Sequence, residues 1–523
     1  MRTIHFGDFV WTETIKHEFR AAVSDLDVQL KLEKRNASVC TVARGCLEMF
    51  LLELSHLSAL VTALTSVVSA LILLAVSKQL WTFRWTNTRD KECKLPLPNG
   101  SMGWPLVGET FHWLFQGSNF HISRREKHGN VFKTHLLGKP VIRVTGAENI
   151  RKILLGEHNL VCTQWPQSTR IILGPNTLVN SIGDLHKNKR KILAKVFSRG
   201  ALEMYLPRLQ AVVKSEIAKW CSEPGPVDVY AAAKSLTFHI AVRILLGLKM
   251  EEKRIVYLSQ IFEQLINNLF SLPIDAPMSG LRKGIKAREM LHACMEKIIK
   301  EKIQKPESEK YYDAFDYMLS SAKENRQELS MQELKETAVE LIFAAHSTTA
   351  SASTSLILQL LRHPGVVEKA RIELESEGLV SNTQSNNSCY RKENGLKVSG
   401  GYRTALQTFE LDGYQIPKGW SVMYSIRDTH ETAAVFQSPE IFNPDRFRTK
   451  HDESKTGRFN YVPFGGGIRS CVGKQLAQMI LKTLAVEVIG TCKWTLATEN
   501  FPKMQTVPIV HPVNGLHVHF NYA

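Results

Sequence analysis

The stretch FGGGIRSCVG, residues 464–473, decides how the rest of this 523-residue sequence is interpreted. Its three consecutive glycines permit a close approach to a large flat ligand, in backbone conformations closed to other residues. Cys471 follows, and apolar residues then recur at three- and four-residue intervals from Leu476 to Val488, which predicts a helix. Cys471 therefore lies at or just before a helix N-terminus, where free N–H groups favour a thiolate and tune a bound metal.

The same stretch resembles the haem-binding signature of the cytochrome P-450 superfamily, F-x-x-G-x-R-x-C-x-G. The residues at its fixed positions are Phe464, Gly467, Arg469, Cys471 and Gly473. An isolated buried cysteine is usually a small apolar core residue, but this full match favours a ligand. The resemblance implies that Cys471 is the axial thiolate of haem b and that Arg469 pairs with a haem propionate. Thiolate ligation favours O–O cleavage, so the implied class is a monooxygenase.

Composition is compatible with one large fold that encloses a cofactor. The hydrophobic content of 44% suffices for a core, and no long linker follows residue 110. Nine cysteines without C-x-x-C pairs argue against a disulfide framework or a zinc site, and favour a reducing compartment. The net charge of +16 suits an acidic partner or an anionic membrane surface. Nucleic acid is the weaker interpretation, because no helix-turn-helix or RNA-binding motif accompanies the charge.

The N-terminal region predicts a membrane anchor. Residues 1–48 are mixed in charge, without a clear helical period or a signal-peptide cleavage site, and form an expected extension. From Leu54 to Ser77 no Asp, Glu, Lys or Arg occurs, which is long enough to cross a bilayer. Basic residues follow and place the rest of the chain in the cytosol; a buried core helix is the alternative. We expect the anchor over 49–80, with Met49 as a candidate start site.

The remaining chain is expected to contain a basic, proline-rich hinge over 81–110 and one haem-thiolate catalytic domain over 111–523. The resemblance implies a mainly α fold with a small β region. Residues from Val131 to Arg143 are β-branched and apolar, and a break at 138–140 predicts a hairpin.

A long helix is predicted after Ser330, which forms a capping box with Glu333, and no proline interrupts it before Pro364. We expect it to be the longest helix of the chain. At its middle, FAAHSTT (343–349) resembles the family motif [AG]-G-x-[DE]-T-T. The resemblance implies a proton-delivery role for Thr348, with Ser347 in place of the usual acid.

Two further segments match haem-contacting elements of the family. The family motif W-R-x-x-R aligns with residues 186–190, so that His186 takes the tryptophan position and Arg190 the position of the final arginine. A solvated charged helix face is the alternative. Arg403, in an expected strand, matches another propionate ligand.

The chain departs from the family where an E-x-x-R helix should precede that strand. Its glutamate and arginine normally form a buried triad with the arginine of a P-x-R-F element, present here as Arg446. The nearby pair Glu368 and Arg371 lies too far upstream and is interpreted as a chance match. Residues 376–397 are polar and weakly patterned, so we interpret the block as lost from the sequence. An arginine buried without its partner costs about 3–5 kcal/mol.

Four stretches resemble the vertebrate retinoic acid hydroxylases, over about Met49 to Ala523: WPQS (165–168), NLFSLPID (268–275), SGGYR (399–403) and GYQIPKGW (413–420). The resemblance implies hydroxylation of all-trans-retinoic acid by O₂ in the endoplasmic reticulum membrane, with electrons from NADPH through a separate cytochrome reductase. The implied substrate contacts are Trp165, Phe270 and Val398, for which aromatic or apolar core packing is the alternative. A reductase contact is expected from Lys187, Lys189, Lys191, Lys474 and Lys482, for which a solubilising face is the alternative.

Three other functions are considered. Another lipid, such as a sterol or a fatty acid, is the alternative substrate. An inactive membrane-anchored isoform is the alternative if the chain lost haem together with its E-x-x-R helix. A cysteine-nucleophile hydrolase is the weakest, because no histidine or oxyanion context accompanies Cys471.

Overall fold

The computed structural model of the chain describes residues 37–248, 250–304, 313–325, 328–376, 401–436, 438, 441–442, 457–505 and 509–523. The chain divides into two compact units, Met1–Leu80 and Trp81–Ala523. The predicted residues Val398 and Arg446, and the segment where the E-x-x-R helix was expected, lie outside the described residues.

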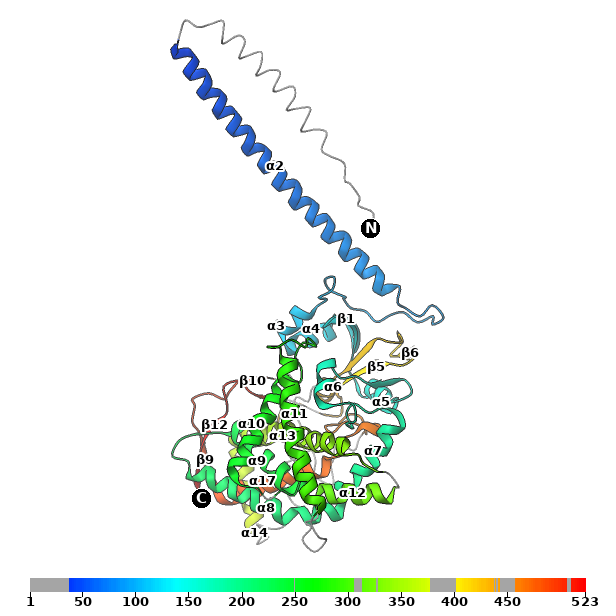
Figure 1. The fold of residues 1–523 in the computed structure, drawn as a ribbon, viewed down its shortest axis with the longest axis vertical. Helices are drawn as coiled ribbons and strands as arrows, with labels where there is room; N and C mark the ends of the chain where they lie inside the picture. The colour runs from blue at the N-terminus through cyan, green and yellow to red at the C-terminus, as the bar shows by residue number, and fades with distance from the viewer. Residues whose placement is uncertain are drawn as a thin grey trace. The chain divides into compact units, whose positions relative to one another are not determined.

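The described part of the first unit is one helix, α2 (Ala37–Thr86), which ends in the second unit (Figure 1). The most apolar part of its span Leu52–Thr86 is entirely exposed, and the span is long enough to cross a membrane. Such a helix is compatible with membrane anchoring. It begins at Ala37, upstream of the predicted start, because a helix propagates readily from an apolar nucleus once that nucleus has formed.

The second unit consists mainly of helices. They are α3 (Thr110–Gln116), α4 (Ser118–His128), α5 (Ala147–Leu155), α6 (Gln167–Leu173), α7 (Gly183–Val196), α8 (Arg199–Ser222), α9 (Val229–Ile240), the π-helix η1 (Ala241–Leu245), α10 (Glu252–Asn268), α11 (Gly280–Gln304), α12 (Ala314–Glu324), α13 (Met331–Arg362), α14 (Pro364–Ser376), α16 (Ile426–Thr432), the 3₁₀-helix η6 (Gly467–Arg469) and α17 (Lys474–Thr491).

A five-stranded sheet accompanies the helices in the order β1-β2-β8-β5-β3. Its strands are β1 (Val131–Leu136), β2 (Lys139–Val144), β3 (Val161–Thr163), β5 (Tyr402–Ala405) and β8 (Ser421–Tyr424). The smaller ladders pair β6 (Phe409–Leu411) with β7 (Tyr414–Ile416), β10 (Met504–Gln505) with β11 (His511–Pro512), and β12 (His517–Tyr522) with both β4 (Val227–Asp228) and β9 (Cys492–Leu496).

The predicted hairpin is present as β1 and β2, which pair antiparallel. Its turn is at Leu137 and Gly138, whose φ angles are 52° and 77°. Two positive φ angles match the right-handed twist of the flanking strands. Pro140 therefore lies within β2, opposite His135, and not in the turn.

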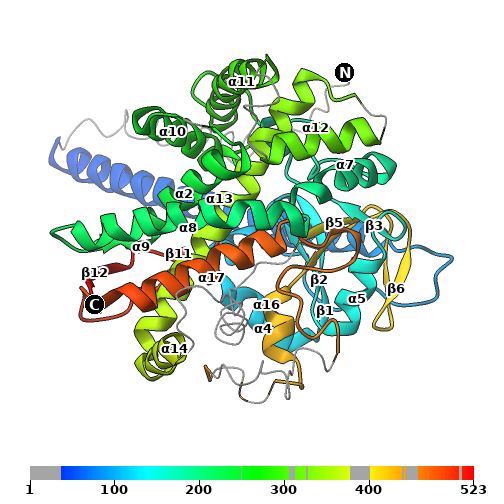
Figure 2. The same ribbon diagram turned by 90° about the horizontal axis from the view of Figure 1, so that it is seen from below.

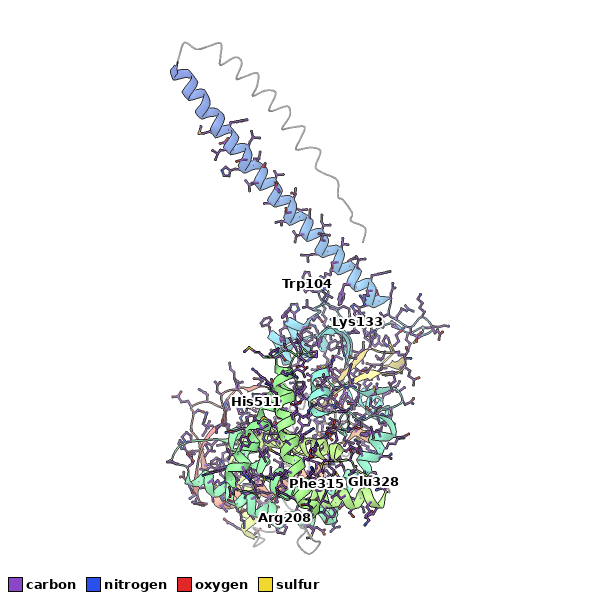
Figure 3. The ribbon with its side chains drawn as sticks, viewed as in Figure 1. Trp104, Lys133, Arg208, Phe315, Glu328 and His511 are labelled. Carbon is purple, nitrogen blue, oxygen red and sulfur yellow. The ribbon has the colours of Figure 1, made fainter. Side chains whose placement is uncertain are left out.

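Two helices pass through the core of the second unit. Helix α13 begins with the predicted capping box, in which Ser330 and Glu333 each bond the backbone of the other, and most of its 32 residues are buried. It packs against α9, α11 and α17, while α17 also lies beside α8 (Figure 2). Buried side chains such as Phe315 fill the space among the helices (Figure 3). The prediction that α13 is the longest helix is wrong, because α2 has 50 residues.

Candidate functional site

The loop that carries Cys471 packs against the end of α5. The Cys471 N–H donates to the Phe464 carbonyl, with an N···O distance of 2.9 Å. Gly467 has a φ of 64°, and a Cβ there would lie 2.1 Å from the carbonyl oxygen of Leu154. Glycine at this position therefore allows η6 to contact α5, which brings Arg469 to the segment that follows α5.

Cys471 lies just before α17, as predicted, with Gly473 as the N-cap residue. Burial raises the pKa of the Cys471 thiol, against the opposing effects of the Gly473 N–H and of the charges on Arg190 and Lys474. Desolvation thus outweighs the helix terminus, although we expected the terminus to favour a thiolate. A coordinating metal deprotonates such a thiol outright, whereas a nucleophilic cysteine needs a lowered pKa. This environment favours a metal ligand over the hydrolase.

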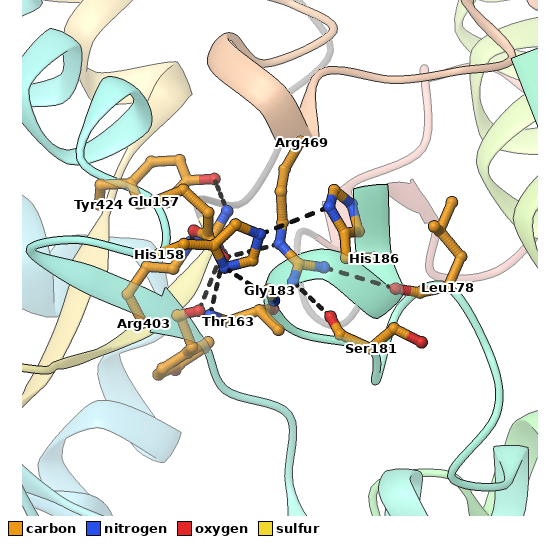
Figure 4. Close-up of polar contacts among 11 residues, drawn as sticks. Glu157, His158, Thr163, Leu178, Ser181, Gly183, His186, Arg403, Tyr424 and Arg469 are labelled. Carbon is orange, nitrogen blue, oxygen red and sulfur yellow. Dashed lines mark hydrogen bonds and ion pairs between the residues drawn. The ribbon is translucent and has the colours of Figure 1, made fainter. Parts of the chain in front are cut away.

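A buried carboxylate joins two of the predicted propionate ligands (Figure 4). Glu157 lies between α5 and β3, and its Oε1 accepts from Arg469 Nε at 2.7 Å. Its Oε2 accepts from Arg403 Nε at 2.6 Å. The Thr163 N–H also donates to Oε1, at 3.0 Å. The carboxylate therefore brings together arginines from the Cys471 loop and from β5.

Arg469 also holds the loop that precedes α7. Its Nη2 donates to the Ser181 carbonyl at 2.5 Å, and its Nη1 lies 3.4 Å from the Leu178 carbonyl oxygen. The N–H groups of Leu178 and Val179 in turn donate to Glu340 of α13, at 2.7 and 2.8 Å. The loop therefore connects the core helix to the arginine of the Cys471 loop.

The two residues predicted from α7 lie in the same region. Arg190 Nη2 donates to the Ser470 carbonyl at 2.6 Å, next to Cys471. His186 is buried, with Nδ1 3.5 Å from His158 Nε2. Burial and the neighbouring charges of Arg469 and Arg190 lower the pKa of His186 to about 3. His186 is therefore neutral at physiological pH and adds no charge to the cluster.

The middle of α13 has an accessible strip on an otherwise buried helix. Ala344 and Thr348, one turn apart, are exposed, and Thr348 Oγ1 donates to the Ala344 carbonyl at 2.7 Å. Ser347 is buried, and its hydroxyl lies 3.1 Å from Nδ1 of His346. Burial lowers the pKa of His346 to about 4. Ser347 therefore pairs with a neutral imidazole and offers no acid.

These features fit a haem group. Cys471 keeps an exposed side chain although the surrounding protein desolvates it, and Ala344 and Thr348 are exposed on a core helix. Three guanidinium groups, from Arg190, Arg403 and Arg469, provide donors for carboxylates. The donor set therefore matches a flat cofactor with one thiolate ligand and two acidic side chains.

The structure joins the segments of two predicted substrate contacts, because the hydroxyls of Ser168 and Thr169 at the start of α6 donate to the carbonyl of Leu269. Trp165 is half-buried between β3 and α6. Phe270 lies just after α10 and is 54% exposed, with Leu272 and Ile274 similarly exposed nearby. Contacts to a substrate by these residues remain predictions.

The predicted reductase patch is partly wrong. Lys189 has only 11% of its side chain exposed, and it bonds the Asn176 carbonyl and Glu333 of α13. Its helical spacing on α7 could not reveal that partner, which comes from a distant helix. Lys187, Lys191 and Lys474 are exposed, whereas Lys482 is half-buried.

The alternative E-x-x-R pair does not form a buried site. Glu368 is 64% exposed and lies 3.7 Å from Arg371 on the surface of α14. Arg371 Nε and Nη2 instead donate to the carbonyls of Ile489 and Cys492, both at 3.3 Å. This agrees with the interpretation of the pair as a chance match.

Sequence reasoning missed Glu157, which is the most connected residue of the site. A single glutamate between Gly156 and His158 matches no motif that we considered. Its importance comes from partners 246 and 312 residues away in the sequence. The only local signal was an acidic residue between the apolar stretches 153–155 and 160–161.

This fold and this cysteine site together define the class of haem-thiolate proteins. The sequence model of the family described as "Cytochrome P450" matches residues 98–385 and 397–519, so the chain belongs to the cytochrome P450 family. Members are monooxygenases that hold haem through a cysteine thiolate.

Named relatives are similar over most of the chain. Cytochrome P450 26B1 of Xenopus tropicalis is 55% identical over 480 residues, which cover 88% of this chain and 94% of that protein. Human cytochrome P450 26C1 is 55% identical over 510 residues, covering 90% and 98%. A solved structure, retinoic acid bound cyanobacterial CYP120A1, superposes with a TM-score of 0.75 at 34% identity and covers 82% of this chain and all of that one.

Proposed function

We propose that this chain, when loaded with haem, hydroxylates a retinoid, with all-trans-retinoic acid as the substrate. The observation that carries this proposal is the similarity to CYP120A1, which has retinoic acid bound and is matched over its whole length. The stretches 165–168 and 268–275, which resemble those of retinoic acid hydroxylases, support the same substrate.

In this proposal Cys471 would supply the thiolate ligand of haem, and Arg190, Arg403 and Arg469 would hold its propionates. Haem with a thiolate ligand supplies the activation of O₂ for insertion of one oxygen atom into a C–H bond. Thr348 presents its hydroxyl on the exposed strip of α13. Because Ser347 is not an acid and is paired with His346, proton delivery relies on Thr348 and on water.

The balanced reaction is RH + O₂ + NADPH + H⁺ → ROH + H₂O + NADP⁺. The electrons come through a separate NADPH-cytochrome reductase. We place α2 in the endoplasmic reticulum membrane, with an extension over 1–48, the anchor over 49–80, the hinge over 81–110 and the cytosolic catalytic domain over 111–523. The apolar, unburied span of α2 supports this arrangement.

Incubation of the reconstituted protein with retinoic acid, a sterol and a fatty acid in competition tests the substrate. We expect hydroxylated retinoic acid as the main product, measured per haem and not per polypeptide. Preferential oxidation of the sterol or the fatty acid would replace the retinoid as the substrate.

A second candidate is an isoform that loads little haem. The observation that favours it is the surface position of Glu368 and Arg371, which offer no buried triad for Arg446. Haem per polypeptide measures how far the loss of this triad limits the chain, and activity per haem measures whether the haem-loaded fraction hydroxylates the retinoid or is inactive.

A further inference from the structure

Glu157 is a buried carboxylate among the arginines that are expected to bind the carboxylates of haem, which is unusual because it occupies part of their donors. Its side chain is 1% exposed, and both oxygens accept from arginines that the family motifs assign to haem propionates (Figure 4). The N–H of Thr163 fixes the same carboxylate to β3. A buried charge requires such partners. Glu157 uses only the Nε atom of each arginine, so the other N–H groups of both guanidinium groups can serve further acceptors.

Both guanidinium groups keep N–H groups that no hydrogen bond of the described residues uses. A guanidinium has five N–H groups. Arg403 directs Nε to Glu157, Nη1 to the Tyr402 carbonyl at 2.9 Å and Nη2 toward the Tyr424 hydroxyl at 3.5 Å. Arg469 likewise donates once from each nitrogen, so two N–H groups remain on each arginine among the contacts of the described chain.

The net charge of the arginine cluster also matches a ligand with two carboxylates. The three guanidinium groups of Arg190, Arg403 and Arg469 and the one carboxylate of Glu157 leave a formal charge of +2. His186 stays neutral at physiological pH, because its pKa is lowered to about 3. A haem group has two propionates, so its charge balances the cluster. Without Glu157 the same arginines would carry one uncompensated charge more.

We propose that Glu157 is a positioning residue: it holds Arg403 and Arg469 by their Nε atoms and directs their remaining N–H groups to the two propionates of haem. This inference rests on the proposed haem site. It predicts that Glu157 determines how strongly the chain distinguishes haem b from haem dimethyl ester, whose side chains are neutral.

The test is a titration of the purified full-length chain in detergent with haem b and, separately, with the dimethyl ester. The ratio of the two affinities measures the contribution of the propionate charges. Glu157→Asp keeps the charge but is one methylene shorter and cannot reach both arginines, so we expect this ratio to fall about tenfold, which equals about 1.4 kcal/mol. Glu157→Gln also removes the negative charge, which by itself favours the propionates, so we expect its ratio to lie above that of Glu157→Asp.

The matched control is Glu148→Gln on α5, because Glu148 is 83% exposed and pairs with Arg151 only at 3.5 Å. Thermal unfolding without haem identifies any variant that fails to fold, and Glu157→Asp is the milder change if Glu157→Gln does so. A wild-type ratio in Glu157→Asp would show that charge alone matters, and would overturn the positioning role while the haem site stands. If the wild-type chain binds neither porphyrin, the same titration is made in the chain that has an E-x-x-R helix in place of residues 377–397. Absence of binding there as well would overturn the haem site and this inference together.

Discussion

Glutamate–arginine pairs of opposite character lie near the two ends of α17. Near its N-terminal end, Glu157 is buried and bridges Arg469 and Arg403. Near its C-terminal end, Arg371 bonds the carbonyls of Ile489 and Cys492, while Glu368 faces solvent. Only the second pair has the E-x-x-R spacing of the family. The difference shows that burial and bridging between segments, and not spacing along one helix, make such a pair part of a site.

The largest expected effect is at Cys471, at the N-terminal end of α17. The reduced protein with CO bound should show the red-shifted Soret band of thiolate ligation, and Cys471→Ala should abolish it. A band typical of histidine ligation in the parent chain would refute the assignment.

Arg469→Ala removes the arginine of the buried pair Glu157–Arg469, whereas the Glu157 variants above alter the glutamate. It leaves Glu157 with one cation fewer and the Ser181 carbonyl without its donor. Removing one partner of a buried pair costs about 3–5 kcal/mol, which denaturant unfolding of the haem-free chain measures. Unchanged stability would mean that solvent already screens this cluster.

Substitutions near the C-terminal end of α17 should lower the stability much less. Arg371→Ala removes two long hydrogen bonds, to the carbonyls of Ile489 at the end of α17 and of Cys492 just after it, and should cost about 1 kcal/mol. Glu368→Gln should change stability by no more than about 0.5 kcal/mol, as is usual at exposed sites. The same unfolding experiment compares the two variants. If Glu368→Gln were as damaging as Arg469→Ala, the two ends of α17 would not differ as described.

The smallest effect concerns electron supply through the exposed lysines near the N-terminal end. Reductase-dependent turnover should weaken with ionic strength, because salt screens exposed charges. Substitution of Lys187, Lys191 and Lys474 should reduce that dependence on salt. Substitution of Lys189, which is largely buried and pairs with Glu333, should instead lower the stability of the protein. Turnover that stays constant from low to high salt would remove this patch as a docking surface.

The sequence predicts the local parts of this molecule well. The capping box at Ser330, the hairpin, the strand at Arg403 and the helix after Cys471 all follow from short-range pattern and are present. Glycine at 467 was recognised from its motif, but the reason for it, contact with the Leu154 carbonyl, needed the fold.

Long-range features could not be predicted in this way. Glu157 matters because β5 and the Cys471 loop reach it from far along the sequence. Lys189 appeared to be part of an exposed charged face, yet Glu333 of another helix pairs with it. The thiol of Cys471 appeared to be activated by a helix terminus, yet burial raises its pKa. In each case a partner or a desolvating environment from a distant segment outweighs the local pattern.

The most direct measurement of the central claim is haem per polypeptide in two chains purified in parallel. One is this chain as written, and the other has residues 377–397 replaced by a helix with the E-x-x-R pattern of the family. We predict little haem and little retinoic acid turnover in the first, and nearly one haem per polypeptide in the second, because only there does Arg446 regain its partners. Stoichiometric haem with turnover in the chain as written would contradict this account, and would show that Glu368 and Arg371, or another pair, replace the lost helix.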